Sequence, residues 1–442
     1  MRGIPSFLLL FCLLLAEIHQ AAAAETRVSA NDVAAFDAAV AGAKAGDVIL
    51  MEPGEWKDAA LVFRGMGSKD KPITLRAMTP GTVKLTGDSS LRLAGSHLVV
   101  EGLWFQNAFP ARWDVIMFRE DSKNPASHCT LRDCAITQDA EAADTKERKW
   151  VSLYSVGNVV ERCHFEGKTS KGTLLVAWLP EKDGQPAAHL IQKNYFGPRP
   201  RLGKNGGEII RLGDSDTSLQ SAACTVADNL FVQCDGEVEC ISNKSCDNQY
   251  LRNTFSECQG TLTLRHGNRC LVEGNWFDGK HRKFTGGIRI IGENHVVRGN
   301  HLQGLEGDGA RTAICIMNGI KDSPANGYLQ VKKAEVTGNS IMDCKNSIVI
   351  GYADEDVTAI MPPECDFRDN AVAARDGKII ELLEPAAKLQ WNDNVMGGGE
   401  LGVAPSEGIK IVQTLDVKPA TGTKPVDRAQ VGVSWIVSPR EP

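Results

Sequence analysis

A set of four charged residues between positions 237 and 265 has the side chains needed to move a proton beside a cation. Glu237 and Glu239 are two residues apart, Lys244 follows in a Ser-Asn-Lys-Ser segment, and Arg265 comes 21 positions after the lysine. Paired carboxylates suit a hard cation such as calcium. A lysine can act as a base when nearby positive charge lowers its pKa. The set therefore predicts proton abstraction from an anionic substrate.

The spacing of these residues predicts that they share one face of neighbouring strands. Residues two apart in a strand point the same way, so Glu237 and Glu239 should point outward while Val238 and Cys240 point into the interior. The segment 260–266, Gly-Thr-Leu-Thr-Leu-Arg-His, repeats this alternation and places its arginine on the face of the glutamates. The charged residues form one surface patch if the two strands stack.

An internal repeat indicates that the strands do stack. Similar segments recur along the chain, among them LVVEGLWF at 98–105, CTVADNLF at 224–231 and CLVEGNWF at 270–277. A shared register position falls at Leu103, Cys134, Cys163, Asn194, Asn229, Asn253, Asn275, Asn300, Asn339, Asn370 and Asn394. A strand-based period of roughly 20 to 50 residues predicts an all-β solenoid, here a right-handed parallel β-helix. The inward asparagines should then stack about 4.8 Å apart and bond to one another, which is a structural role.

The open ends of such a solenoid must be covered, because a free strand edge invites pairing with other chains. A short amphipathic helix over 31–42, with Asn31 as its N-cap, is expected to cover the first coil. The irregular segment after Glu400 is expected to cover the far end.

The first 24 residues have the features of a secretory signal. Arg2 precedes an apolar run from Phe7 to Leu15, and small residues precede a cleavage position near Ala24. This run is too short to span a membrane. We expect residues 1–24 to be removed, and 25–442 to form a single domain that is secreted or periplasmic and not inserted in a membrane.

The composition restricts the kinds of molecule and metal that the protein is expected to bind. A formal net charge of -6 disfavours nucleic acid, although a local basic groove can still hold a polyanion, and we expect a monomer. Thirteen cysteines, less Cys12 in the leader, leave twelve without a Cys-x-x-Cys pair, so no zinc or iron–sulfur site is expected. Cys234 and Cys258 each follow a register asparagine by five residues, which makes them vertical neighbours and the one pair to consider for a disulfide.

A uronic-acid polymer is a substrate that matches a cation, a base and an arginine on one open face. A cation would neutralise the sugar carboxylate, Lys244 would remove the acidified C5 proton, and the oxygen at C4 would leave. To act at neutral pH the lysine needs a pKa lowered by about 2 to 3 units. The preceding coil offers Asn205 and Glu208 as a third ligand for the cation, and we favour Asn205.

Several stretches resemble polysaccharide lyase family 6, the family of alginate lyases and chondroitinase B. They are NGGEIIRLG, GEVECISNKS, GTLTLRHGNRCLVEGNWF and GGIRIIGENHVV, with KPITLRAMTPGTVKLTG and LVVEGLWF nearer the N-terminus. The resemblance implies Lys244 as the catalytic base and Arg265 as the group that assists the leaving oxygen. It also implies calcium bound by Asn205, Glu237 and Glu239, and His266 as a substrate contact.

The leading prediction is therefore a calcium-assisted alginate lyase, and two alternatives stay open. A lyase of dermatan sulfate would need further arginines for sulfate. The candidates are Arg199, Arg201, Arg289 and Arg298, of which only Arg289 has an outward position on the patch sheet, so we expect Arg289 to bind substrate. A non-catalytic β-helix protein that binds carbohydrate would share the repeats, but it gives no reason for the catalytic set to occur together.

Overall fold

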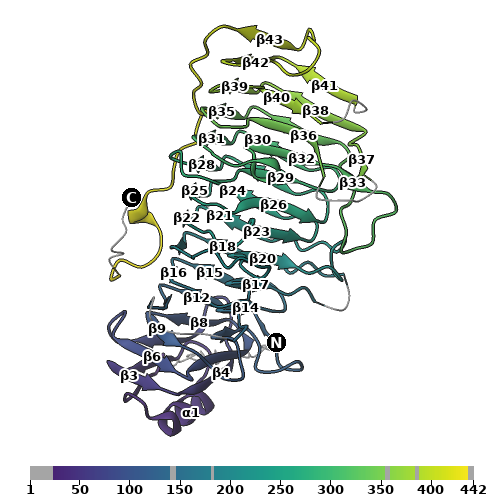
Figure 1. Cartoon of the computed structure of the whole chain (residues 1–442). Coiled ribbons are helices and arrows are strands. Elements are labelled where there is room, and N and C mark those ends of the chain that lie inside the picture. Colours follow the sequence, from purple (N-terminus) through teal and green to yellow (C-terminus); the bar gives the residue numbers. More distant parts are fainter. Residues whose placement is uncertain (1–22, 140–145, 181–183, 354–358, 384–387, 437–442) are drawn as a thin grey trace, which may run out of the picture.

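The chain winds into stacked coils of short strands, as the computed structural model in Figure 1 shows. The structure describes residues 23–139, 146–180, 184–353, 359–383 and 388–436. Strands of successive coils pair in parallel and build three long sheets of 14, 13 and 14 strands. This confirms the predicted all-β parallel β-helix. The proposed signal lies almost wholly outside the described residues, and no helix among the described residues is long and apolar enough to cross a membrane.

The 13-stranded sheet carries the predicted patch. The first 14-stranded sheet runs from β1 (Glu25–Val28) to β41 (Lys388–Asn392), and the second runs from β3 (Gly54–Lys57) to β43 (Ile409–Val412). The members of the 13-stranded sheet are β4 (Ala60–Met66), β7 (Ser90–Ser96), β10 (Ile116–Met117), β11 (Ala126–Ser127), β14 (Val151–Leu153), β17 (Leu175–Ala177), β20 (Ile210–Gly213), β23 (Glu239–Lys244), β26 (Thr261–His266), β29 (Ile288–Ile290), β32 (Ile314–Met317), β36 (Ile348–Tyr352) and β40 (Ile380–Leu382).

The asparagine column forms the predicted ladder. The side-chain amide of Asn275 donates to Oδ1 of Asn300 at 2.9 Å and to the carbonyl of Tyr250 at 2.9 Å. Its own Oδ1 accepts the backbone N–H and the side-chain amide of Asn253, at 2.9 and 3.0 Å. The pattern repeats from Asn194 to Asn394. Each buried amide is thereby satisfied, which confirms the structural role of these asparagines.

The strand β23 departs from the predicted alternation. It begins at Glu239, and Cys240 is an extra residue between two positions that pair with consecutive residues of β26. Cys240 is buried in the interior as predicted, and after the bulge the interior positions of β23 are Ile241 and Asn243, which are fully buried. Val238 was expected in the interior, but it precedes the strand and is only partly buried.

A helix covers the first coil, as predicted. It is α1 (Val33–Gly42), and it buries Phe36, whose ring meets Trp56 edge-on with centroids 6.2 Å apart. The expected N-cap at Asn31 is wrong by one residue. Asp32 caps the helix by accepting the backbone N–H of Ala35 at 2.9 Å, whereas Asn31 turns the chain with φ of 59°.

The segment after Glu400 does more than cover the far end. It adds β43 to the sheet, and residues 413–436 then run back along the side of the solenoid as a C-terminal strap (Figure 1, yellow). The carbonyl of Lys418 accepts the hydroxyl of Ser340 at 2.7 Å, and Trp435 lies 5.7 Å from Trp104 in the early coils. The strap therefore joins coils that are distant along the axis.

All twelve cysteines of the described residues are free and buried. Cys234 and Cys258 are vertical neighbours as predicted, since the backbone N–H of the first donates to Sγ of the second at 3.5 Å. Cys240 joins them, and the three sulfur atoms lie within 4.8 Å of one another. No disulfide links them, and these thiols fill the interior of the solenoid.

Candidate active site

Two β-bulges shape the site on β23 and β26. One inserts Cys240 into β23, and the other inserts Arg265 into β26, so that Lys244 pairs with His266. A bulge re-aims the side chains beside it. Here it lets Arg265 and His266, although consecutive, meet on the outer face, where Nη1 of the arginine lies 2.9 Å from Nε2 of the histidine.

Glu239 lies between two arginines at the centre of the site. Its Oε1 is 3.8 Å from Nε of Arg265 and 3.7 Å from Nη1 of Arg289. The side chain of Arg289 is only 3% exposed, so this predicted substrate contact faces Glu239 rather than solvent. The predicted meeting of Glu239 with Arg265 is present, and Arg289 completes the group.

Tyr328 lies against both arginines and was not predicted. The guanidinium of Arg265 is 4.0 Å from the centroid of its ring, and that of Arg289 is 5.6 Å away. Arg265 also donates to the carbonyls of Gly327 at 2.6 Å and Asn326 at 3.3 Å. These residues belong to the loop between β33 (Gly319–Ile320) and β34 (Ala334–Thr337). The loop thus holds the catalytic-arginine candidate from above the sheet.

A second part of the site gathers carboxylates. Glu237, just before β23, accepts the backbone N–H of Gly206 at 3.1 Å. Burial, and after it the negative charges of Glu208 and Glu239, raise the pKa of Glu237 to about 8. Glu208 is buried and accepts the hydroxyl of Thr173 at 3.1 Å. The carboxylates of Glu208 and Glu239 are thus close enough to oppose the ionisation of Glu237.

This carboxylate cluster fits a divalent cation. Hard cations such as calcium take oxygen ligands from carboxylates and amides, and they relieve the repulsion that raises the pKa of Glu237. The residue favoured as third ligand, Asn205, is exposed and immediately precedes Gly206 on the loop that contacts Glu237. Glu208, the other candidate from that loop, lies inside the cluster. The structure thus brings the loop of Asn205 to Glu237, the first of the two predicted glutamates.

His266 is neutral at the site. Burial and the positive charges of Arg265 and Lys244 lower the pKa of His266 to about 4. Because a guanidinium can only donate, Nε2 of His266 accepts from Arg265 and the proton lies on Nδ1. Nδ1 has no hydrogen-bond partner among the described residues. The atom is buried, so His266 does not present this donor to solvent.

An aromatic row continues the outer face of the 13-stranded sheet toward the N-terminus. The rings of Tyr154 and Trp178, which follow β14 and β17, stack 6.3 Å apart, and cations cover the row. They are Arg211 at 4.8 Å from the ring of Trp178, Arg119 at 3.8 Å from that of Tyr154 and Arg92 at 4.6 Å from that of Trp113. The rings hold the arginines in a row, and such a row suits an anionic sugar chain because its cations bind carboxylates. No sequence pattern marked it.

Two other arginines that were considered as sulfate ligands make contacts away from the patch. Arg199 is 2% exposed, and its guanidinium donates to four backbone carbonyls, including those of Gly206 and Glu208. It therefore supports the loop of the carboxylate cluster from within. Arg298 pairs with Glu273 at 3.0 Å on the surface.

The model of the chondroitinase B family matches residues 30–374. This chain belongs to the chondroitinase B family. The match confirms the resemblance to polysaccharide lyase family 6, because the similar solved structures are lyases of that family. No curated protein sequence matches the chain significantly.

Three solved structures show the likeness. The family 6 alginate lyase AlyGC is 35% identical with a TM-score of 0.88 over 95% of this chain. A mannuronic acid specific family 6 lyase from human gut microbiota is 29% identical, with a TM-score of 0.80 over 89% of this chain and 91% of its own. The family 6 lyase Pedsa3628 from Pseudopedobacter saltans is 27% identical, with a TM-score of 0.73 over 93% of this chain and 99% of its own. The chain spans only 60% of the length of AlyGC.

Proposed function

We propose that this chain is a secreted or periplasmic lyase that cleaves alginate by β-elimination. The observation that carries the proposal is the convergence of Lys244, Arg265 and the carboxylate cluster on neighbouring strands of one sheet. The family match and the alginate lyases among the similar structures support the substrate class. The signal features of residues 1–24 support export.

In the proposed reaction Lys244, as the free amine, accepts the C5 proton of a uronate unit. A double bond forms between C4 and C5 as the bond from C4 to the glycosidic oxygen breaks, and solvent returns the proton to the leaving oxygen. Arg265 holds positive charge beside the developing negative charge, in a position preset by Gly327 and Tyr328. An enzyme gains most from charges that need no rearrangement during the reaction.

The cation proposed for this site is calcium. Asn205, Glu237 and Glu239 would hold it, with Glu208 close by. When bound, it would neutralise the uronate carboxylate and make the C5 proton more acidic. His266 would position Arg265 by accepting its N–H at Nε2, and the arginines of the aromatic row would bind further sugar units.

Ultraviolet absorbance of the unsaturated product tests the proposal. Purified protein should release product from polymannuronate, polyguluronate or mixed alginate and not from dermatan sulfate. Lys244→Ala should lower kcat by about 10² to 10⁴-fold, the usual contribution of a positioned base. Lys69→Ala, which removes an exposed lysine on an early coil, should leave the rate unchanged. Product from dermatan sulfate alone, or full activity of Lys244→Ala, would contradict the proposal.

A further inference from the structure

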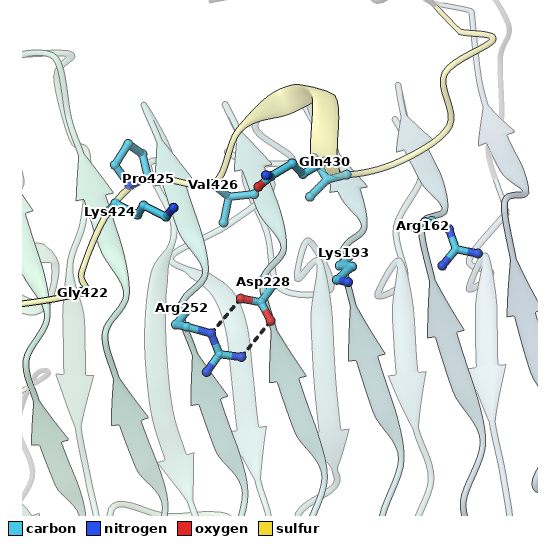
Figure 2. Close-up of a pocket in the computed structure, with 10 residues that line it drawn as sticks. Arg162, Lys193, Asp228, Arg252, Gly422, Lys424, Pro425, Val426 and Gln430 are labelled. Carbon is cyan, nitrogen blue, oxygen red and sulfur yellow. Dashed lines mark hydrogen bonds and ion pairs between the residues drawn. The ribbon is translucent and has the colours of Figure 1, made fainter.

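A cavity of about 500 Å³ lies beneath the C-terminal strap, on a different side of the solenoid from Lys244. Figure 2 shows the strap crossing above a row of charged side chains at the corner between the two 14-stranded sheets. The row is formed by the residues that precede the register positions of four successive coils. They are Arg162, Lys193, Asp228 and Arg252, all with φ between 50° and 56°. Because their backbones share this conformation, their side chains project outward in line.

The cavity carries unneutralised positive charge. Arg252 is held by Asp228 through two hydrogen bonds of 2.8 Å, and Arg162 is held by Asp133 at 2.8 and 2.9 Å. The ammonium groups of Lys193 and, on the strap, Lys424 have no hydrogen bond or ion pair in the part of the chain that the structure describes. Two cations therefore remain for an anion from outside.

The strap is anchored on both sides of this cavity without filling it. On one side the hydroxyl of Thr423 donates to the carbonyl of Gly299 at 2.8 Å. On the other side the backbone N–H of Gly432 donates to the carbonyl of Lys193 at 2.9 Å, and Val431 packs on Tyr195. Between the anchors, Pro425 and Val426 line the cavity with apolar surface.

We propose that this cavity is an accessory binding site for a short run of uronate units. Lys193 and Lys424 would bind the carboxylates, and Pro425 and Val426 would contact the apolar faces of the sugar rings. The volume lies within the range of about 300 to 1,000 Å³ that ligand pockets occupy. The assignment of the ligand rests on the proposed function. A second contact on the same polymer would raise its effective concentration at the active site.

Isothermal titration with a mannuronate trisaccharide tests this site. The full chain carrying Lys244→Ala serves as the parent, so that the probe is not cleaved. Lys193→Ala combined with Lys424→Ala should remove one binding site per chain, from two to one. Lys69→Ala combined with Lys410→Ala removes the same charge from exposed positions away from the cavity and should remove none.

The inference is overturned if the double variant binds as many trisaccharides as its parent. Since both lysines are exposed, the thermal midpoint should not change, which separates lost binding from lost folding. Turnover of alginate by the unmodified chain is measured separately. Turnover without an accessory site overturns this inference alone, whereas an inactive chain that binds nothing overturns the proposed function as well.

Discussion

Tyr328 connects the two arginines that flank Glu239, which makes it a positioning residue for Arg265. A cation–π contact is worth about 0.5 to 2 kcal/mol, depending on how far the pair is shielded from water. Tyr328→Ala should therefore lower kcat by about 2- to 30-fold, with a smaller effect on KM, because the arginine is needed most in the transition state.

Tyr328→Phe is the matched control, because it keeps the ring and removes only the hydroxyl, which lies 3.4 Å from Arg289. Steady-state kinetics on alginate should give nearly unchanged values for this variant. If both substitutions lowered kcat equally, the effect would come from the hydroxyl, and the role given to the ring would be refuted.

The carboxylate cluster should make the stability of the cation-free protein depend on pH. Because the pKa of Glu237 is raised to about 8, the folded chain without a cation keeps a proton between roughly pH 4.3 and 8 that the unfolded chain loses. The free energy of unfolding of chelated protein should thus fall as pH rises through this window.

Calcium should reverse this fall, since it favours the ionised carboxyl group. Glu237→Gln should abolish both the fall and the response to calcium, because it removes the titrating group and one ligand. Urea unfolding at several pH values, with chelator or with calcium, measures both effects. A wild-type chain that calcium does not stabilise at pH 8 would argue against the cation site.

At the scale of elements, the repeat predicted the solenoid because asparagine recurs at the one turn where successive coils have buried backbone groups that need a hydrogen-bond partner. Asn275 and its counterparts satisfy amides that would otherwise be orphaned, so their spacing alone marks the coils. The bulges at Cys240 and Arg265 were not predicted, although the alternation of residue types breaks at both, with two consecutive apolar residues at Cys240 and two consecutive polar ones at Arg265. Tyr328 was not predictable either, since its loop reaches Arg265 from 63 positions away in the chain.

The turns before several strands of the first 14-stranded sheet contain a second set of such hydrogen bonds, accepted by Asn158, His189, Asn248 and His295. Nδ1 of His295 accepts the backbone N–H of Cys270 at 3.1 Å, and its Nε2 donates to the carbonyl of Ile291 at 2.9 Å. In another coil Asn248 does the same for Cys224 at 2.9 Å. Burial lowers the pKa of His295 to about 4, so the folded chain excludes a proton that the unfolded chain takes up below pH 6.5.

It follows that His295 makes the unfolding free energy decrease as pH falls from 6.5 to about 4, by about 1.4 kcal/mol per pH unit. His295→Asn should keep the hydrogen bond to Cys270 and remove this contribution. Denaturant unfolding at pH 7.5 and pH 5 should show a smaller difference for the variant than for the wild type. An identical difference would mean that His295 does not titrate in this range.

At the scale of the whole molecule, the strap opposes the modular behaviour of a solenoid. In repeat proteins each coil contacts only its neighbours, so distant coils can unfold separately. Here the strap contacts Ser340, Thr254 and the early coils in turn. At its far end the ring of Trp435 lies on Gly81, where an added Cβ would come within 2.5 Å of the ring and φ is +78°.

Removing residues 413–442 should therefore lower both thermal stability and cooperativity. The deletion would expose the apolar cluster of Tyr195, Leu230 and Val232, and it would uncouple the first coils from the last. Calorimetry should give a lower midpoint, and the van't Hoff enthalpy should fall below the calorimetric enthalpy as the transition ceases to be two-state. Trp435→Ala removes only the last anchor and should lower the midpoint less. A single two-state transition of the truncated chain would contradict this prediction. It would mean that the sheets alone couple the coils and that the strap only covers the cavity.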